Sequence, residues 1–173
     1  MSIEIDILNG NASWARVKPL IDLVWTPQTL AQSGNVDWAH PDLRVLVEND
    51  SREIICHIGL FFRDGLWNGR KARMGGIGGV TTHPDHRRKG YASVALDAAI
   101  QTIRHHEAID FVLLVCNDDK MPFYAARKWQ PFNGVLMVEQ SGRQVPFDVM
   151  KPMVFDMAMQ PRTGTIDLCG LPW

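Results

Sequence analysis

The chain has 173 residues, of which 46% are hydrophobic, and its formal net charge is −1. That length suits one compact domain with a sizeable core, so we expect a single domain over residues 1–173. The balanced charge argues against nucleic acid or an anionic membrane as a partner, and no apolar run approaches a membrane span. The three cysteines are too widely spaced for a disulfide framework or a zinc ribbon, and we expect no metal site and a cytoplasmic location.

The first half of the chain predicts one strand, two helices and three strands. The strand and helix assignments rest on alternating and helix-like spacing of apolar residues, and Trp67-Asn68-Gly69-Arg70 is a hairpin signal. In chain order we expect a strand at 3–8, a helix at 12–25, a second helix from Thr26-Pro27, a loop at 34–42, and strands at 43–48, 53–66 and 71–82.

The second half predicts alternating helices and strands. We expect a helix at 89–105, a buried strand at 110–116, a helix at 119–128, strands at 132–140 and 148–158, and an irregular tail at 167–173. Strand 71–82, helix 89–105 and strand 110–116 should form a βαβ crossover. The predicted fold class is α/β (α+β), with a mixed, mostly antiparallel sheet of about six to seven strands and about four helices on its faces.

The segment His83–Ser93 carries the most chemical information, and we call it the cradle segment. It joins the strand at 71–82 to the helix at 89–105 through a basic turn with Arg87, Arg88 and Lys89. A helix N-terminus offers unpaired N–H groups and the positive end of a dipole, and Gly90 lets the backbone approach an anion closely. These features favour a diphosphate ligand, with Tyr91, Ala92 and Ser93 forming the first helical turn.

Two common nucleotide motifs are absent. A P-loop needs Gly-Lys-Ser/Thr, and that tripeptide does not occur in the sequence. The dinucleotide fingerprint fails because Gly76-Ile77-Gly78 is followed by Thr81 where the third glycine belongs.

The remaining pattern, Arg87-Arg-Lys-Gly90-Tyr-Ala92 after His83-Pro84-Asp85, resembles the GCN5-related N-acetyltransferase (GNAT) superfamily. A second stretch supports the resemblance, since the strand at 110–116 leads to Asn117 and then to Pro122-Phe123-Tyr124, although Lys128-Trp129 replaces the Gly-Phe pair. Residues 53–135 carry the likeness, which implies an acetyltransferase that uses acetyl-CoA.

The resemblance also assigns roles to residues. It implies that Val80 and Thr82 pair with the pantetheine arm, that the amides of Arg88–Ser93 hold the pyrophosphate together with Arg87 and Lys89, and that Asn117 belongs to the cofactor site. A backbone N–H near Val80 would polarise the thioester carbonyl. Tyr124 matches the general acid of the family, with core packing as the alternative for this side chain.

The general base is open. The position at which related enzymes carry a strand glutamate is Gly78, so we take His57 as the first substitute and a buried structural histidine as its alternative. Glu48, Asp37 and His40 are further candidates. An acyl-cysteine route through Cys116 is less favoured than an inert buried thiol.

Within the superfamily the chain is most similar to aminoglycoside 2'-N-acetyltransferases and nodulation N-acyltransferases, through Trp38-Ala39, Pro41–Arg44, Ile54–Arg63 and the Trp-terminated tail. We expect transfer to a primary amine of a small molecule, such as an amino sugar, with Trp38, Gly78 and Trp173 at the acceptor site. The alternatives are an acyl-CoA-binding regulatory module and a protein or peptide N-acetyltransferase. A homodimer is expected by analogy with relatives.

Overall fold

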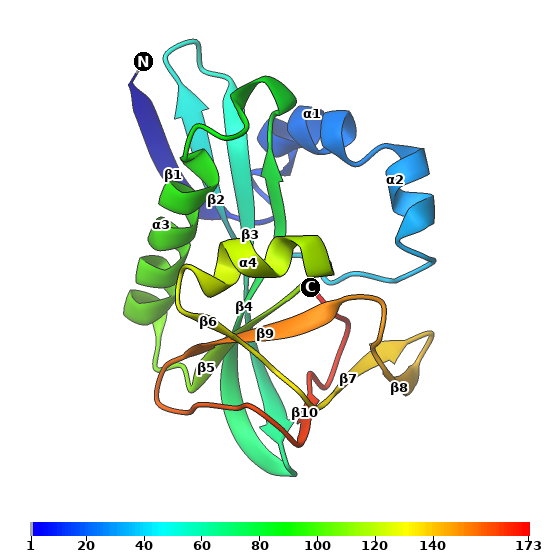
Figure 1. The fold of residues 1–173 in the computed structure, drawn as a ribbon. Helices are drawn as coiled ribbons and strands as arrows, with labels where there is room; N and C mark the ends of the chain where they lie inside the picture. Colours follow the sequence, from blue (N-terminus) through cyan, green and yellow to red (C-terminus); the bar gives the residue numbers. More distant parts are fainter. Residues whose placement is uncertain (1) are drawn as a thin grey trace. The chain divides into compact units, whose positions relative to one another are not determined.

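The computed structural model describes residues 2–173 and contains ten strands and four α-helices within them (Figure 1). In chain order the elements are β1 (Ile3–Asn9), α1 (Trp14–Val24), α2 (Pro27–Gln32), β2 (Leu43–Asn49), β3 (Ile54–Trp67), β4 (Arg70–Thr82), the 3-10 turn η1 (Pro84–His86), α3 (Tyr91–His106), β5 (Phe111–Cys116), the 3-10 turn η2 (Asp118–Lys120), α4 (Met121–Ala125), β6 (Trp129–Pro131), β7 (Val135–Gln140), β8 (Arg143–Pro146), β9 (Lys151–Asp156) and β10 (Thr165–Asp167). The predicted mixed α/β class is confirmed.

The predicted number of strands was too low. The three that sequence spacing missed are β6, β8 and β10, which have only three or four residues each. Runs this short do not establish a period of two, and both β6 and β8 end in proline. The helix expected at 119–128 is also shorter, because the chain forms η2 first and α4 covers only Met121–Ala125.

The described residues divide into two compact units. The first contains the chain up to Asn35, His40–Phe61 and Ile77–Glu107, and the second contains Val36–Ala39, Phe62–Gly76 and Ala108–Trp173. The long strands β3 and β4 contribute residues to both units. The expectation of a single domain stays a prediction.

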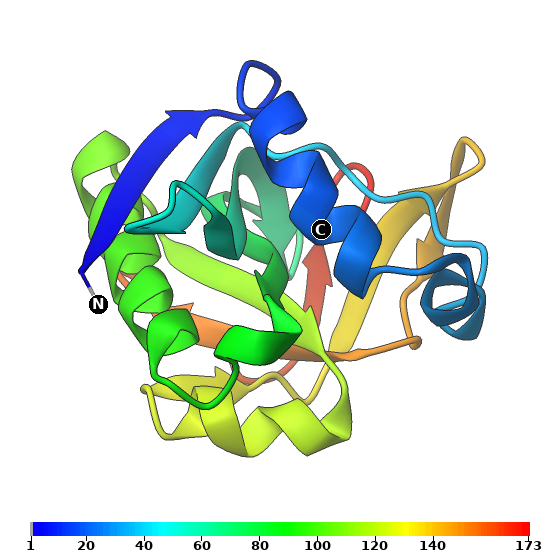
Figure 2. The same cartoon turned by 90° about the horizontal axis from the view of Figure 1, so that it is seen from above.

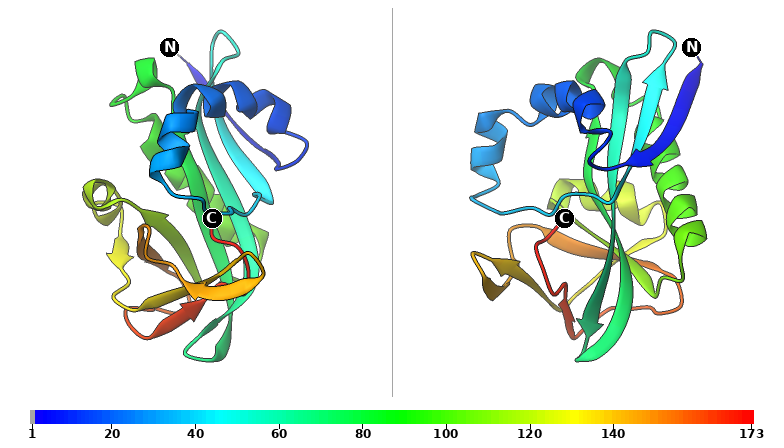
Figure 3. Two further views of the ribbon diagram at one scale, coloured as in Figure 1. Left: turned by 90° about the vertical axis from the view of Figure 1, so that its right-hand side faces the viewer. Right: turned by 180° about the vertical axis from the view of Figure 1, so that it is seen from behind.

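In the first unit, β1 pairs antiparallel with β2, and β2 pairs antiparallel with the first part of β3. Helix α3 packs on β1 and β2 (Figure 2) through five buried residues at helical spacing, Ala95, Leu96, Ala99, Ile100 and Ile103. Helix α1 lies on the other face of these strands (Figure 3) and buries Val17 and Leu20. The sheet is therefore covered on both faces, which explains why β2 is buried along nearly its whole length.

In the second unit the strand order is β6-β9-β5-β4-β3-β10-β7-β8. Met74–Gly76 of β4 pair in parallel with Phe111–Leu113 of β5, which confirms the predicted βαβ crossover. The neighbouring β5 and β9 are antiparallel.

The predicted hairpin turn is confirmed. Asn68 and Gly69 both have positive φ, 52° and 77°, as a two-residue turn with a right-handed strand twist requires. The same geometry recurs at Ser141 and Gly142, with φ of 51° and 72°, where β7 turns into β8. The Ser141-Gly142 pair is therefore a hairpin signal of the same kind as Asn68-Gly69.

Candidate functional site

The cradle segment forms a tight turn from the end of β4 to the start of α3. His83 caps the one-turn η1 by accepting a hydrogen bond from the Asp85 amide at 3.2 Å. The turn is closed by side chains that bond back to its own backbone: Arg87 Nε donates to the Thr82 carbonyl at 3.3 Å, and Lys89 Nζ donates to the Asp85 carbonyl at 2.8 Å. The loop is therefore preorganised by its own residues.

The N-terminus of α3 has features that favour the binding of an anion. Gly90 is the N-cap residue in a left-handed conformation, with φ 86° and ψ 0°, and Arg88 is also left-handed, with φ 58°. The first turn of the 16-residue helix holds no acidic side chain, so nothing offsets the positive end of its dipole. Residues 87–90 are exposed. These residues fit a pyrophosphate group.

The structure brings most of the predicted cofactor residues together in the first unit, because they follow one another along β4, the turn and α3. These residues are Val80, Thr82, Arg87, Arg88, Lys89, Gly90, Tyr91, Ala92 and Ser93. Asn117 and Tyr124 lie in the second unit.

A hydrogen-bond network surrounds Gly79 of β4. The Gly79 carbonyl accepts from Thr81 Oγ1 at 2.9 Å and contacts His57 Nδ1 at 2.8 Å. Trp25 Nε1 donates to Thr81 Oγ1 at 2.8 Å, and Arg44 Nη1 lies 2.8 Å from His57 Nε2. Sequence reasoning missed Trp25, Arg44 and Thr81.

The surroundings of His57 do not suit a general base. A guanidinium only donates, so Nε2 accepts from Arg44 and Nδ1 carries the hydrogen that is donated to Gly79. The side chain is buried, and burial lowers its pKa to about 4, with the positive charge of Arg44 acting in the same direction against the hydrogen bond to Gly79. The lone pair that a base needs is already occupied, which favours the structural alternative for His57.

This pKa predicts how stability depends on pH. In the unfolded chain His57 titrates near 6.5, so between that value and about 4 the unfolded state binds more protons than the folded state. The contribution of neutral His57 is complete above pH 6.5 and is lost as the pH falls towards 4. We expect urea unfolding to show a loss of about 2–3 kcal/mol between pH 7.5 and 4.5 from this residue.

The control for this prediction is His57→Asn, which cannot titrate. The stability difference between wild type and this variant should shrink as the pH falls, because only the wild type loses the contribution of neutral histidine. Parallel pH profiles for the two proteins would contradict the assignment.

Gly78 and the further candidate bases lie in different surroundings. Gly78 is buried in β4 and has no side chain to offer, and its carbonyl lies close to Gly59 of β3. Glu48 is buried and forms ion pairs with Arg16 and Arg52. Asp37 and His40 are exposed.

Tyr124 is buried in the second unit and held by aromatic neighbours. Its ring meets Phe123 edge-on at 5.0 Å between centroids and Trp129 at 6.1 Å. Arg127 fixes the same helix, because it lies 3.9 Å from the centroid of the Phe123 ring and donates to the Phe123 carbonyl. This packing leaves the Tyr124 phenol little rotational freedom, which suits a positioned acid and a core residue alike.

Cys116 ends β5 as a buried thiol. Burial raises its pKa to about 11, and the carboxylates of Asp118 and Asp119 act in the same direction. At neutral pH the group is therefore a thiol rather than the thiolate that an acyl-cysteine route needs, which favours the inert alternative. The adjacent Asn117 is exposed, and its carbonyl accepts from the Lys120 amide as η2 begins.

Trp173 and Trp38 both lie in the second unit. Trp173 is buried, donates from Nε1 to the Leu113 carbonyl at 2.9 Å and lies under the guanidinium of Arg63 at 4.9 Å. Its indole occupies the space beside Gly76, where any side chain would collide with it. Trp38 is half-buried and meets Phe147 edge-on at 5.8 Å.

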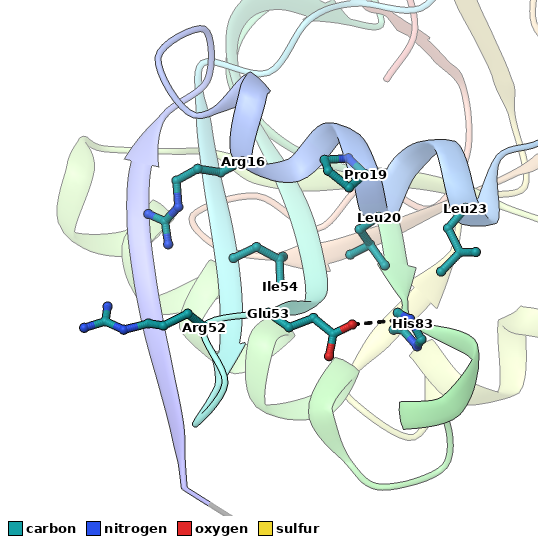
Figure 4. Close-up of a pocket in the computed structure, with 8 residues that line it drawn as sticks. All are labelled: Arg16, Pro19, Leu20, Leu23, Arg52, Glu53, Ile54 and His83. Atoms are coloured by element: carbon teal, nitrogen blue, oxygen red, sulfur yellow. Dashed lines mark ion pairs between the residues drawn. The ribbon is translucent and has the colours of Figure 1, made fainter.

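A pocket of about 370 Å³ lies beside the first residue of the cradle segment (Figure 4). Figure 4 shows the Glu53 carboxylate pointing at His83, with 3.6 Å between Oε1 and Nε2. The lining residues are Arg16, Pro19, Leu20, Leu23, Arg52, Glu53, Ile54 and His83. An apolar wall from α1 thus faces the Glu53–His83 pair, and the cationic side chains of Arg16 and Arg52 complete the lining.

Comparison with known proteins decides the family. The family model described as an acetyltransferase (GNAT) domain matches residues 12–132, more than half of the chain. This chain belongs to the GNAT acetyltransferase family. Acetyltransferases of this family use acetyl-CoA, so the predicted superfamily, enzyme class and cofactor are confirmed at that level.

Solved structures share the fold at low sequence identity. Escherichia coli ElaA is 16% identical with a TM-score of 0.65, and the match covers 90% of this chain and 100% of that one. A Brucella melitensis GNAT acetyltransferase in complex with acetyl-CoA is 12% identical with a TM-score of 0.59, over 95% and 94% of the two chains. A GCN5-related N-acetyltransferase from Kribbella flavida is 13% identical with a TM-score of 0.55, over 75% of this chain, which spans only 33% of that protein.

These comparisons do not test the predicted subfamily or the predicted acceptor. A search of curated proteins finds no match. The likeness to aminoglycoside 2'-N-acetyltransferases and nodulation N-acyltransferases therefore stays a prediction. Within residues 2–173, no helix is both long and apolar enough to cross a membrane.

Proposed function

We propose that this GNAT protein transfers an acetyl group from acetyl-CoA to the primary amine of a small molecule. The observation that carries the proposal is the N-terminus of α3, where left-handed Gly90 opens a helix whose first turn has no acidic residue. Exposed Arg87, Arg88 and Lys89 supply the charge that a pyrophosphate requires.

In the proposed site, the amides of Arg88–Ser93 bind the pyrophosphate, and Val80 and Thr82 pair with the pantetheine arm through their backbone. Asn117 is a further proposed cofactor-binding residue. When bound, acetyl-CoA supplies the acetyl thioester that the amine attacks. The Val80 N–H would donate a hydrogen bond to the thioester carbonyl and so stabilise the charge that develops on its oxygen.

Proton transfer is divided between two steps. An ammonium group must first pass a proton to a base or a water chain, since a lysine-type amine has a pKa of about 10.4 and only the neutral amine attacks. His57 is not assigned this task, because its Nε2 already accepts from Arg44. Tyr124 donates a proton to the departing thiolate, a role supported by the family resemblance and by the packing that fixes its ring.

The acceptor in this proposal is a small amine, with amino sugars and aminoglycoside-like molecules as the first candidates. Trp38, Gly78 and Trp173 are the proposed acceptor residues.

The test is release of free thiol from acetyl-CoA in the presence of amines. We expect turnover with amino sugars or other small amines, and none with their hydroxyl analogues, because the hydroxyl group lacks the nucleophilic nitrogen. Acetyl-CoA binding without turnover on any amine or peptide would instead identify a regulatory module. Turnover confined to peptides or protein N-termini would identify a protein acetyltransferase.

We also infer a single-domain, cytoplasmic enzyme that forms a homodimer. The cysteines Cys56, Cys116 and Cys169 are all free, which supports a reducing compartment. Sedimentation equilibrium measures the oligomeric state, and a single cooperative unfolding transition is expected for one domain.

A further inference from the structure

The peptide unit that joins Gly79 to Val80 is held in an unusual way. Gly79 has a φ of 59°, in the left-handed region, so β4 departs from regular strand geometry at this residue. Its carbonyl oxygen receives two hydrogen bonds, from Thr81 Oγ1 at 2.9 Å and from His57 Nδ1 at 2.8 Å. Both donors belong to side chains that are 2% exposed. We call Thr81 and His57 together the carbonyl clamp.

The direction of each clamp hydrogen bond is fixed by a second donor. Trp25 Nε1 donates to Thr81 Oγ1, which turns the hydroxyl hydrogen towards Gly79. Arg44 donates to His57 Nε2, which leaves the hydrogen on Nδ1. Arg44 is itself anchored, since its Nε donates to the Gly10 carbonyl at 3.0 Å.

The clamp acts on the next amide because a peptide unit is planar. No peptide bond among the described residues is cis, so the Gly79 carbonyl and the Val80 N–H point in opposite directions within one plane. Two donors that fix the carbonyl therefore fix the direction of the N–H as well. They also polarise the peptide unit, which makes the Val80 N–H a stronger hydrogen-bond donor.

We propose that Thr81 and His57 are positioning residues that clamp the Gly79 carbonyl and thereby orient and polarise the Val80 N–H towards the thioester carbonyl of acetyl-CoA. This inference rests on the proposed function, since it concerns the same acyl donor. It explains why a histidine with both nitrogens engaged is buried next to β4. It also explains why a threonine follows Gly79 by two residues on a buried face.

The test uses two pairs of variants. Thr81→Val removes the hydroxyl at almost constant shape, and Thr81→Ser retains it. His57→Asn keeps an amide N–H near the position of Nδ1, whereas His57→Gln places its amide near Nε2 and leaves the Gly79 carbonyl without that donor. In each pair, one variant loses the hydrogen bond to the Gly79 carbonyl and the other keeps it. The comparison therefore separates loss of this hydrogen bond from the other effects of replacing the side chain.

The main readout is the infrared carbonyl band of bound acetyl-CoA labelled with carbon-13 at the acetyl carbonyl. A hydrogen bond to this oxygen shifts the band to lower frequency than in free acetyl-CoA. In Thr81→Val and His57→Gln we expect the band to move back towards the free position, with kcat lower by about tenfold. Thr81→Ser and His57→Asn should restore most of the shift.

Calorimetry with CoA, which has no acetyl group, distinguishes the possible failures. If the wild type binds neither CoA nor acetyl-CoA, the proposed function fails. If the wild type binds acetyl-CoA with a shifted band and all four variants keep that shift, the clamp is wrong while the proposed function stands. Unchanged CoA affinity in the four variants, together with a band that moves only in Thr81→Val and His57→Gln, supports the clamp.

Discussion

Replacement of Gly90 by valine is expected to weaken acetyl-CoA binding by about 100-fold or more, with the fold retained. The φ of 86° at Gly90 is strained for any residue with a Cβ, and most for a β-branched one. A side chain here enters the space that a phosphate needs, and relaxation of φ turns the amides of Tyr91 and Ala92 away. Loss of two charge-assisted hydrogen bonds, about 1.5–3 kcal/mol each, accounts for the size of the effect.

The chain offers a matched control in Gly142→Val. Gly142 has a φ of 72°, and neither glycine has a heavy atom within 4 Å of the place where a Cβ would be, apart from its chain neighbours. The two variants should therefore lose similar stability in urea, but only Gly90→Val should lose affinity by calorimetry. Equal affinity of both variants for acetyl-CoA would show that the pyrophosphate binds elsewhere.

Tyr124→Phe is expected to lower kcat by about 100-fold or more, because the leaving thiolate loses its proton donor. The substitution keeps the ring and hence the edge-on contacts with Phe123 and Trp129. The affinity for acetyl-CoA should stay within about twofold, since no binding group is removed. Steady-state kinetics of thiol release, with the affinity measured separately, test both parts.

The same measurements distinguish a role of Tyr124 as general acid from a role in core packing alone. A core role alone predicts a lower free energy of unfolding with kcat unchanged. Unchanged kcat at every pH would therefore remove Tyr124 from the mechanism and leave the cradle segment unaffected.

Elements with a sustained period were predictable from the sequence, and short ones were not. The spacing of Ala95, Leu96, Ala99 and Ile103 is enough to define a helix because helix packing repeats every three to four residues. The strands β6 and β10 have three residues each and exist because β9, β3 and β7 offer them ladder partners. Such partners are not visible in local sequence.

The features of the cradle segment are also local in sequence. The cradle segment is contiguous, and its chemistry comes from a helix N-terminus, a left-handed glycine and neighbouring cations. All three are local properties, so the sequence alone predicted a pyrophosphate ligand, and that site stays a prediction. The resemblance of the segment to the GNAT superfamily is confirmed by the family model.

The role of His57 required the tertiary structure. Its partners Arg44 and Gly79 are 13 and 22 residues away in the chain, and only the pairing of β2, β3 and β4 brings them within hydrogen-bond distance. Burial then removes water and lowers the pKa, so the residue that looked like a base is held neutral with both nitrogens engaged. Local sequence thus sufficed to predict the family and the long helices and strands, whereas long-range contacts decided which side chains have a lone pair left for chemistry.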